Sequence, residues 1–212
     1  FQESITDPCL YFTKDNSAAV YFHVDDLIHV GHGESFKSNF LSRFKNSACH
    51  PPNTILGMLI EVDRDAIHLS QPKHIIHGLE EMGLSDAKPS STPLTPNIQL
   101  LPASKDEHNQ FLNLNVDYRS SIGLLNYISQ STRPDISFAV SSLARFSTKP
   151  GVIHWREVKR VWKYLKHTIS LRLTLRYNEN KPVLQTFSDA TWGDDPISRK
   201  SQSGFLILAF GT

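Results

Sequence analysis

Two adjacent carboxylates, Asp25 and Asp26, interrupt an apolar run over residues 20–30 that is typical of two β-strands joined by a turn. Burying both carboxylates would cost free energy unless a turn exposed them or a cation bound them. Asp favours turns, so an exposed turn is the ordinary explanation. The chemical alternative is magnesium, which binds one or two protein carboxylates together with the phosphates of a substrate. The pair by itself leaves both explanations open.

A third carboxylate, Asp189, follows a strand-like segment over residues 183–188. At the end of a strand, this residue is as compatible with a turn as with a metal ligand. Asp194 and Asp195 lie nearby, but Pro196 follows them directly, and this composition favours a turn. Asp189 is therefore the single candidate metal ligand in the C-terminal part.

A helix expected over residues 153–167 carries a row of cations that could contact the phosphates of a nucleic acid. The alternative is a solvated helix face, which is the commoner meaning of such a charge pattern. Trp155 and Trp162 lie seven residues apart, so both are expected in the core. The candidate phosphate-contacting cations are Lys159, Arg160, Lys163 and Lys166.

Strand-like and helix-like patterns both occur along the chain, which predicts an α+β fold. After the acidic hairpin, a helix is expected around residues 36–44, then strands over 54–62 and 66–69. Ser70 is placed to cap the next helix, Pro72 fits its first turn, and Gly83 is placed to end it.

Residues 88–109 are dense in Pro, Ser and Thr and have no periodicity, which predicts a linker or an extended crossover. Helical patterns return from Asp117 and continue on both sides of Arg133-Pro134-Asp135. Strands are expected over residues 171–177, 183–188 and 204–210, the last without a visible partner beyond it, so the final sheet looks unfinished.

The 212 residues include 22 basic and 21 acidic side chains, a balance that excludes a wholly basic nucleic-acid coat protein but allows a local basic face. Two cysteines, Cys9 and Cys49, favour a reducing compartment over a disulfide framework. The sequence shows no membrane-spanning run and no signal-like start, so an intracellular protein of the cytoplasm or nucleus is predicted. A start at Phe1 suggests the middle of a longer chain.

The segment Tyr21-Phe22-His23-Val24-Asp25-Asp26-Leu27-Ile28 resembles the Tyr-x-Asp-Asp box of copia-type retrotransposon reverse transcriptases. Further segments resemble the same family, occur in the family's order and cover nearly the whole chain. They are Asp7-Pro8-Cys9-Leu10-Tyr11, Leu56-Gly57-Met58, Leu69-Ser70-Gln71, Thr92-Pro93-Leu94, Tyr118-Arg119, Thr132-Arg133-Pro134-Asp135-Ile136, His154-Trp155, Ser188-Asp189-Ala190-Thr191-Trp192 and Ser201-Gln202-Ser203-Gly204.

The resemblance implies part of a reverse-transcriptase palm and thumb over residues 1–87, a linker over 88–116, a helical connection over 117–170 and a truncated RNase H-like sheet over 171–212. It implies that Asp25 and Asp26 are catalytic ligands of Mg²⁺, with Asp25 the more direct one. It makes Asp189 the first catalytic Asp of RNase H, also a metal ligand. The implied partner is an RNA/DNA template–primer duplex.

The sequence departs from the family at His23, which stands where the family has Tyr, beside the primer end and the incoming nucleotide. Residues 47–52 also lack the family's Lys-Asp-Leu-Gly. The family's other palm Asp would precede Phe1, and its later RNase H acids would follow Thr212, so this chain is not expected to be catalytic in isolation. The alternatives are a non-catalytic nucleic-acid-binding remnant and a transposon relic without a selected function.

Overall fold

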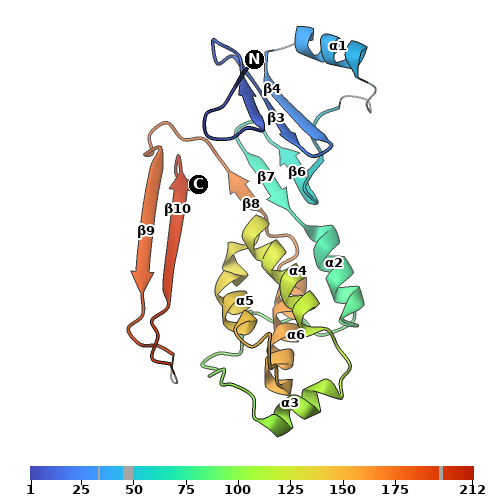
Figure 1. The fold of residues 1–212 in the computed structure, drawn as a ribbon, viewed down its shortest axis with the longest axis vertical. Helices are drawn as coiled ribbons and strands as arrows, with labels where there is room; N and C mark the ends of the chain where they lie inside the picture. Colours follow the sequence, from blue (N-terminus) through green and yellow to red (C-terminus); the bar gives the residue numbers. More distant parts are fainter. Residues whose placement is uncertain (33, 45–49, 196–197) are drawn as a thin grey trace. The chain divides into compact units, whose positions relative to one another are not determined.

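The computed structural model describes residues 1–32, 34–44, 50–195 and 198–212, which form two compact units, Phe1–Ile55 and Leu56–Thr212. Each unit is described by itself. The mixture of helices and strands agrees with the predicted α+β class (Figure 1). Residues 47–49, which include Cys49, and Pro196 lie outside the described residues. The predicted divisions at residues 88, 117 and 171 stay predictions.

The first unit is an antiparallel sheet of order β1-β2-β3-β4 with one helix, α1. The predicted hairpin around the acidic pair is confirmed, since β3 and β4 pair over their whole length. The predicted helix is also confirmed, and its Phe36 ring stacks on His29 of β4 with 5.2 Å between centroids. The element bounds are β1 Gln2–Glu3, β2 Leu10–Phe12, β3 Ala18–His23, β4 Asp26–Gly31 and α1 Glu34–Arg43, and the short strand β5, Thr54–Ile55, ends the unit.

The second unit contains a sheet in which β6 (Met58–Val62), β7 (Ile67–Ser70) and β8 (Leu173–Leu175) are adjacent and antiparallel. The first of the three expected C-terminal strands, β8, pairs with β7 of this sheet. Sequence pattern reports that a segment is extended but not which distant strand it pairs with. Among the described strands, β9 (Leu184–Ala190) pairs only with β10 (Ser203–Ala209).

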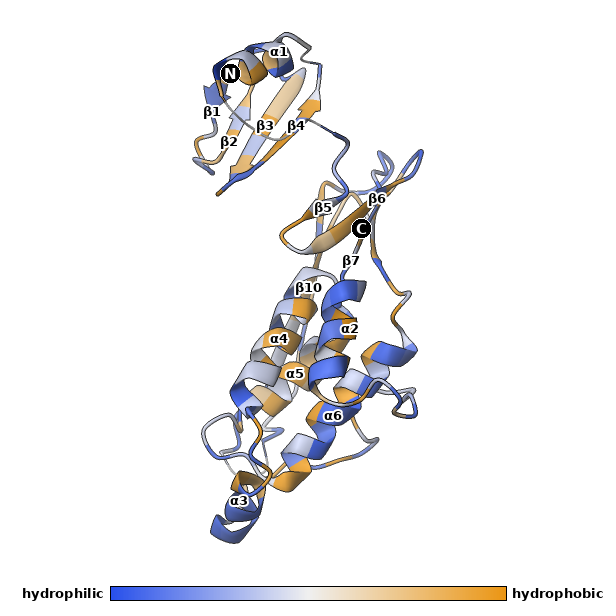
Figure 2. Cartoon of the chain, turned by 90° about the vertical axis from the view of Figure 1, so that its right-hand side faces the viewer, coloured by the Kyte–Doolittle hydropathy of each residue, from blue (hydrophilic) through white to orange (hydrophobic). Residues whose placement is uncertain are grey.

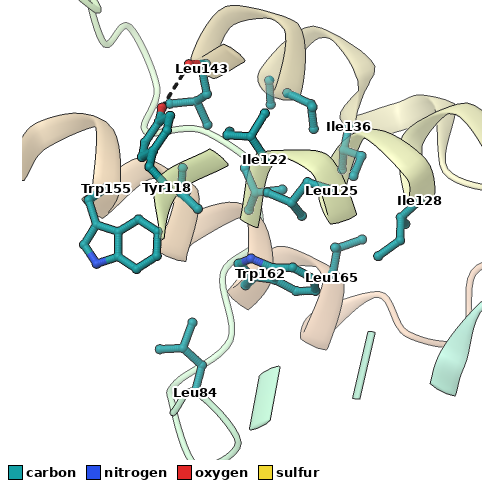
Figure 3. Close-up of a cluster of buried hydrophobic side chains, with 14 of the residues drawn as sticks. Leu84, Tyr118, Ile122, Leu125, Ile128, Ile136, Leu143, Trp155, Trp162 and Leu165 are labelled. Atoms are coloured by element: carbon teal, nitrogen blue, oxygen red, sulfur yellow. Dashed lines mark hydrogen bonds between the residues drawn. The ribbon is translucent and has the colours of Figure 1, made fainter. Parts of the chain in front are cut away.

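The core of this unit lies among four helices: α2 (Pro72–Glu81), α4 (Tyr118–Ser131), α5 (Ser137–Ala144) and α6 (Val152–His167). Figure 2 shows hydrophilic and hydrophobic residues alternating along α2 and α6, as expected of helices buried on one side. In Figure 3 the Tyr118 hydroxyl donates a 2.9 Å hydrogen bond to the Leu143 carbonyl. Burial raises the pKa of this phenol above its usual range. The residues labelled in the close-up include Ile122, Leu125, Ile128, Ile136, Trp155, Trp162 and Leu165.

The helices differ from expectation in two ways: α2 starts at a different cap residue, and one additional helix is present. Gln71, not Ser70, is the N-cap residue of α2, and it supplies no side-chain cap. A further helix, α3 (Lys105–Leu112), lies inside the segment predicted as a linker. A reciprocal capping box starts it: Ser104 Oγ accepts from the Glu107 N–H at 3.2 Å, and Glu107 Oε2 accepts from the Ser104 N–H at 2.8 Å. The predicted helix end at Gly83 is confirmed by a φ of +62° there.

Residues 85–101, called the strap from here on, run antiparallel to α6 as an irregular segment with turns at residues 85–86 and 96–97. Contacts recur about once per helical turn, between Ala87 O and Lys166 Nζ at 2.9 Å and then between the Ser90 N–H and Lys163 O at 3.2 Å. At the other end of the strap, His154 Nε2 donates to Leu101 O at 3.0 Å. The segment is thus an irregular crossover that packs along α6.

Among the described helices, none is both long and apolar enough to cross a bilayer.

Candidate functional site

The acidic pair lies at the tip of the β3–β4 hairpin. His23 ends β3 and pairs in register with Asp26, which begins β4, so the connection is a two-residue turn of Val24 and Asp25. Val24 has a φ of +52° and is 89% exposed. A β-branched side chain disfavours this left-handed conformation, which glycine usually supplies in such turns. The turn therefore holds its backbone at a cost to local stability and projects the tip into solvent.

Both carboxylates of the pair are exposed, and neither accepts a hydrogen bond from another described residue. Their oxygens are therefore available to a cation. The described residues contain no cluster of three or more His, Cys, Asp or Glu side chains that could enclose a metal ion. The tip fits an open magnesium site, in which two carboxylates bind and water or phosphate oxygens complete the shell. A turn explanation and a metal explanation are both compatible with this geometry.

His23 is exposed at the end of β3. No hydrogen bond or ion pair joins its ring to another described residue. It is adjacent to the acidic pair across the hairpin register, at the position where the sequence analysis placed a primer-side contact.

Asp189 lies in the second unit, inside β9, which continues to Ala190, beyond the predicted end at residue 188. It pairs in register with Gly204 of β10. Its Oδ1 accepts from the Ala190 N–H at 2.9 Å, and the residue is exposed. Asp189 is thus the second-last residue of β9, and its role as a metal ligand stays a prediction. Its second carboxylate oxygen has no partner among the described residues.

The four candidate cations of α6 do not form one free row. Arg160 Nη2 donates to Thr92 Oγ1 at 2.8 Å, and Lys166 Nζ donates to the carbonyls of Ser85 and Ala87. These two cations hold the strap. Lys159 and Lys163 are half-buried, and their ammonium groups have no partner among the described residues. The surface available for phosphate contact is correspondingly smaller than the sequence suggested.

Arg133 is the centre of a structural hydrogen-bond network. Arg133 is 2% exposed, and its guanidinium donates to both carboxylate oxygens of Asp135, at 2.9 and 2.8 Å. It also donates to the carbonyl and hydroxyl oxygens of Thr168, at 3.1 and 2.6 Å. Burial raises the pKa of Asp135, but the hydrogen bonds from Arg133 and Tyr164 and the Arg133 charge outweigh it and hold that pKa below its usual value. This network fastens the end of α6 to the turn before α5.

Comparison with curated proteins gives matches along the whole chain. The chain is 33% identical, over 224 residues, to a retrovirus-related Pol polyprotein from the Nicotiana tabacum transposon TNT 1-94, covering 100% of this chain and 17% of that protein. It is 30% identical, over 213 residues, to the corresponding polyprotein from the Arabidopsis thaliana transposon RE1, covering 98% of this chain and 14% of that protein.

The chain belongs to the copia-type Pol polyprotein family. The predicted resemblance is thereby confirmed. The Pol chain is also 30% identical to an uncharacterised mitochondrial protein of Arabidopsis thaliana, AtMg00810, over 190 residues that make up 88% of this chain and 76% of that protein. No protein-family model and no solved structure matches the chain.

The Pol chain spans 14–17% of the length of the transposon polyproteins quoted above. The roles of Asp25, Asp26 and Asp189, the magnesium ion, the nucleic-acid partner and the compartment therefore stay predictions. Sequence reasoning found the residues of the hairpin tip but missed that Arg160 and Lys166 hold the strap. The signal for α3 was present in the Ser104-x-x-Glu107 spacing.

Proposed function

We propose that this chain is part of an RNA-directed DNA polymerase, in which the β3–β4 hairpin contributes two carboxylates to the magnesium site. The observation that carries the proposal is the two-residue turn, which presents Asp25 and Asp26 in solvent without competing hydrogen bonds. Rigid paired strands hold a metal ligand more precisely than a free loop does. The family membership supports the same assignment.

Magnesium bound at the tip would neutralise charge on a phosphate during its transfer. Asp25 and Asp26 would hold the ion, and His23 would lie beside the substrate. Two carboxylates without a third fall short of the set that bridges two ions. Because no cluster of three acidic or metal-binding side chains occurs in the described residues, we propose that the chain does not extend a primer by itself.

The β9–β10 ribbon supports the proposed RNase H-like start with Asp189. Its strands expose large apolar side chains on both faces, with Phe187 and Leu206 paired on one face and Phe205 and Ile207 on the other. Apolar residues on both faces are typical of strands that are covered on both sides in a larger sheet.

A second candidate function is a non-catalytic nucleic-acid-binding module. It is favoured by Lys159 and Lys163, whose ammonium groups have no partner among the described residues. Arg156, on the same helix, is exposed and could add a third cation. Such cations contact phosphates without reading sequence. This candidate needs neither the acidic pair nor magnesium.

Binding to an RNA–DNA duplex with a recessed 3′ end, followed by fluorescence anisotropy at rising salt, tests the partner. We expect the affinity to fall with salt, and the Lys159→Ala, Lys163→Ala double variant to reduce the log–log salt slope by about two, roughly one per lysine. Lys105→Ala, on α3, is the matched control and should leave the slope unchanged. An affinity that does not respond to salt would exclude phosphate contact as its basis.

A primer-extension assay with the chain alone separates the two candidates from a complete polymerase. No extension in Mg²⁺ is expected. Any extension that Asp25→Asn abolishes would show that the chain polymerises by itself and would refute the proposed inactivity.

A further inference from the structure

One residue of the strap, Thr95, makes two hydrogen bonds to a buried carboxylate of α6. Its N–H donates to Glu157 Oε2 and its hydroxyl donates to Glu157 Oε1, both at 2.8 Å. Glu157 is 2% exposed, and no further hydrogen bond to its carboxylate is present among the described residues. Hydrogen bonds to a charged group are stronger than neutral ones, and this Thr95–Glu157 contact is called the latch of the strap from here on.

Thr95 is followed by Pro96, and the chain has one other Thr-Pro pair, Thr92-Pro93. Hydroxyl residues before proline are the acceptors that proline-directed protein kinases require. The two threonines differ in access. Thr95 and Pro96 are exposed, whereas Thr92 is half-buried and its hydroxyl both accepts from Arg160 and donates to the Leu94 carbonyl.

We propose that Thr95 is a phosphorylation site for a proline-directed protein kinase, and that the phosphate opens the strap at the Thr95–Glu157 latch. In the reaction, Thr95 Oγ forms a bond to the γ-phosphorus of ATP held by the kinase. The bond from that phosphorus to its bridging oxygen breaks and ADP leaves. The hydroxyl proton passes to the catalytic carboxylate of the kinase.

The phosphate is incompatible with the latch for two reasons. The esterified Oγ has no proton to donate, so the bond to Glu157 Oε1 is lost. A phosphate also brings a charge of about −1.5 to −2 close to a buried carboxylate, and like charges in a poorly solvated site repel strongly. The Thr95 N–H bond to the same carboxylate cannot form without bringing these charges together.

The closed latch also governs the rate of modification, because the Thr95 hydroxyl is engaged with Glu157 until the strap opens locally. Phosphorylation would therefore proceed from the open state and then prevent reclosure. Glu157→Gln keeps the shape of the side chain but removes its charge. It should raise the open population, and with it the initial phosphorylation rate, at least about tenfold.

The test uses the full chain, ATP and a purified kinase of the mitogen-activated class, with a peptide of residues 90–101 as a control for kinase activity. Mass spectrometry should find one phosphate, at Thr95. Amide hydrogen exchange over residues 90–101 should then accelerate at least about tenfold relative to the unmodified chain. Thr92→Val should still incorporate one phosphate at Thr95 when the reaction is complete, whereas Thr95→Val should abolish incorporation.

Two variants test the opening of the strap without the kinase. Thr95→Glu, which places a carboxylate against Glu157, should accelerate exchange more than Thr95→Val, which loses only the hydroxyl bond. The proposal would be overturned by phosphate at Thr92 alone, or by a folded chain or control peptide that the kinase leaves unmodified. Unchanged hydrogen exchange after modification of Thr95 would also overturn it.

Discussion

Gly78 is the residue that lets α2 and α6 approach closely. A Cβ at this position would lie 2.1 Å from Cη2 of Trp162, a ring that is only 1% exposed and cannot move aside. Gly78→Ala gains helix propensity of about 1 kcal/mol but forces overpacking that costs about 1–3 kcal/mol. We expect a net loss in the free energy of unfolding, measured by urea denaturation.

Gly123 provides the matched control in α4. A Cβ there meets no atom within 4 Å. Gly123→Ala should therefore stabilise the chain by up to about 1 kcal/mol, through helix propensity alone. If Gly78→Ala were as stable as Gly123→Ala, the close packing of Trp162 on α2 would be wrong.

His154 gives the fold a pH dependence. Its Nδ1 accepts from the Gly151 N–H at 2.8 Å, its Nε2 donates to Leu101 O, and its ring stacks on Phe146 with centroids 4.0 Å apart. This arrangement requires the neutral ring, and burial lowers the His154 pKa below its ordinary value of 6.5. As pH falls, the unfolded chain takes up this proton first. The stability from His154 is therefore complete above about pH 6.5 and is lost as pH falls towards the folded pKa.

Urea denaturation at pH 7.5 and 5.5 measures this effect. The free energy of unfolding should be lower at pH 5.5. His154→Gln can still accept and donate one hydrogen bond but does not titrate, so the difference between the two pH values should shrink. An undiminished difference would mean that other groups cause it.

At the scale of elements, α3 depends on its N-terminal capping box. Ser104→Ala removes the oxygen that accepts from the Glu107 N–H, and a loss of about 1 kcal/mol in the free energy of unfolding is expected. Ser104→Asp restores an acceptor and should recover most of the loss. If both variants were equally destabilised, the capping interaction would not be the reason α3 forms there.

The elements differ in how far sequence could predict them. The apolar stripes that contain Ile122 and Leu125, or Val158 and Trp162, repeat at helical spacing, so α4 and α6 were predictable. The strap was recognisable only as a segment without periodicity, because its hydrogen bonds to Glu157 and Arg160 join residues 62 and 68 positions apart. The partner of β8 was not predictable for the same reason.

In the candidate site, too, the sequence predicted the local structure but not the tertiary contacts. The turn at Asp25 and Asp26 was predictable, because strand-forming residues lie on both sides of the acidic pair. The tertiary contacts of Arg160 and Lys166 were not, because charge on a helix face does not reveal whether a distant segment uses it. Half of the predicted basic row therefore belongs to the fold rather than to a nucleic-acid surface.

At the scale of the whole molecule, membership in the copia-type Pol family and an exposed carboxylate pair support one account: the hairpin tip is a weak magnesium site that needs further ligands for catalysis. The most direct test is NMR of the chain titrated with Mn²⁺, a paramagnetic substitute for Mg²⁺. The account predicts selective broadening of the amide signals around residues 23–27, reversal by excess Mg²⁺, and loss of the effect in Asp25→Asn. Broadening that is absent from the tip, or unchanged in Asp25→Asn, would contradict it.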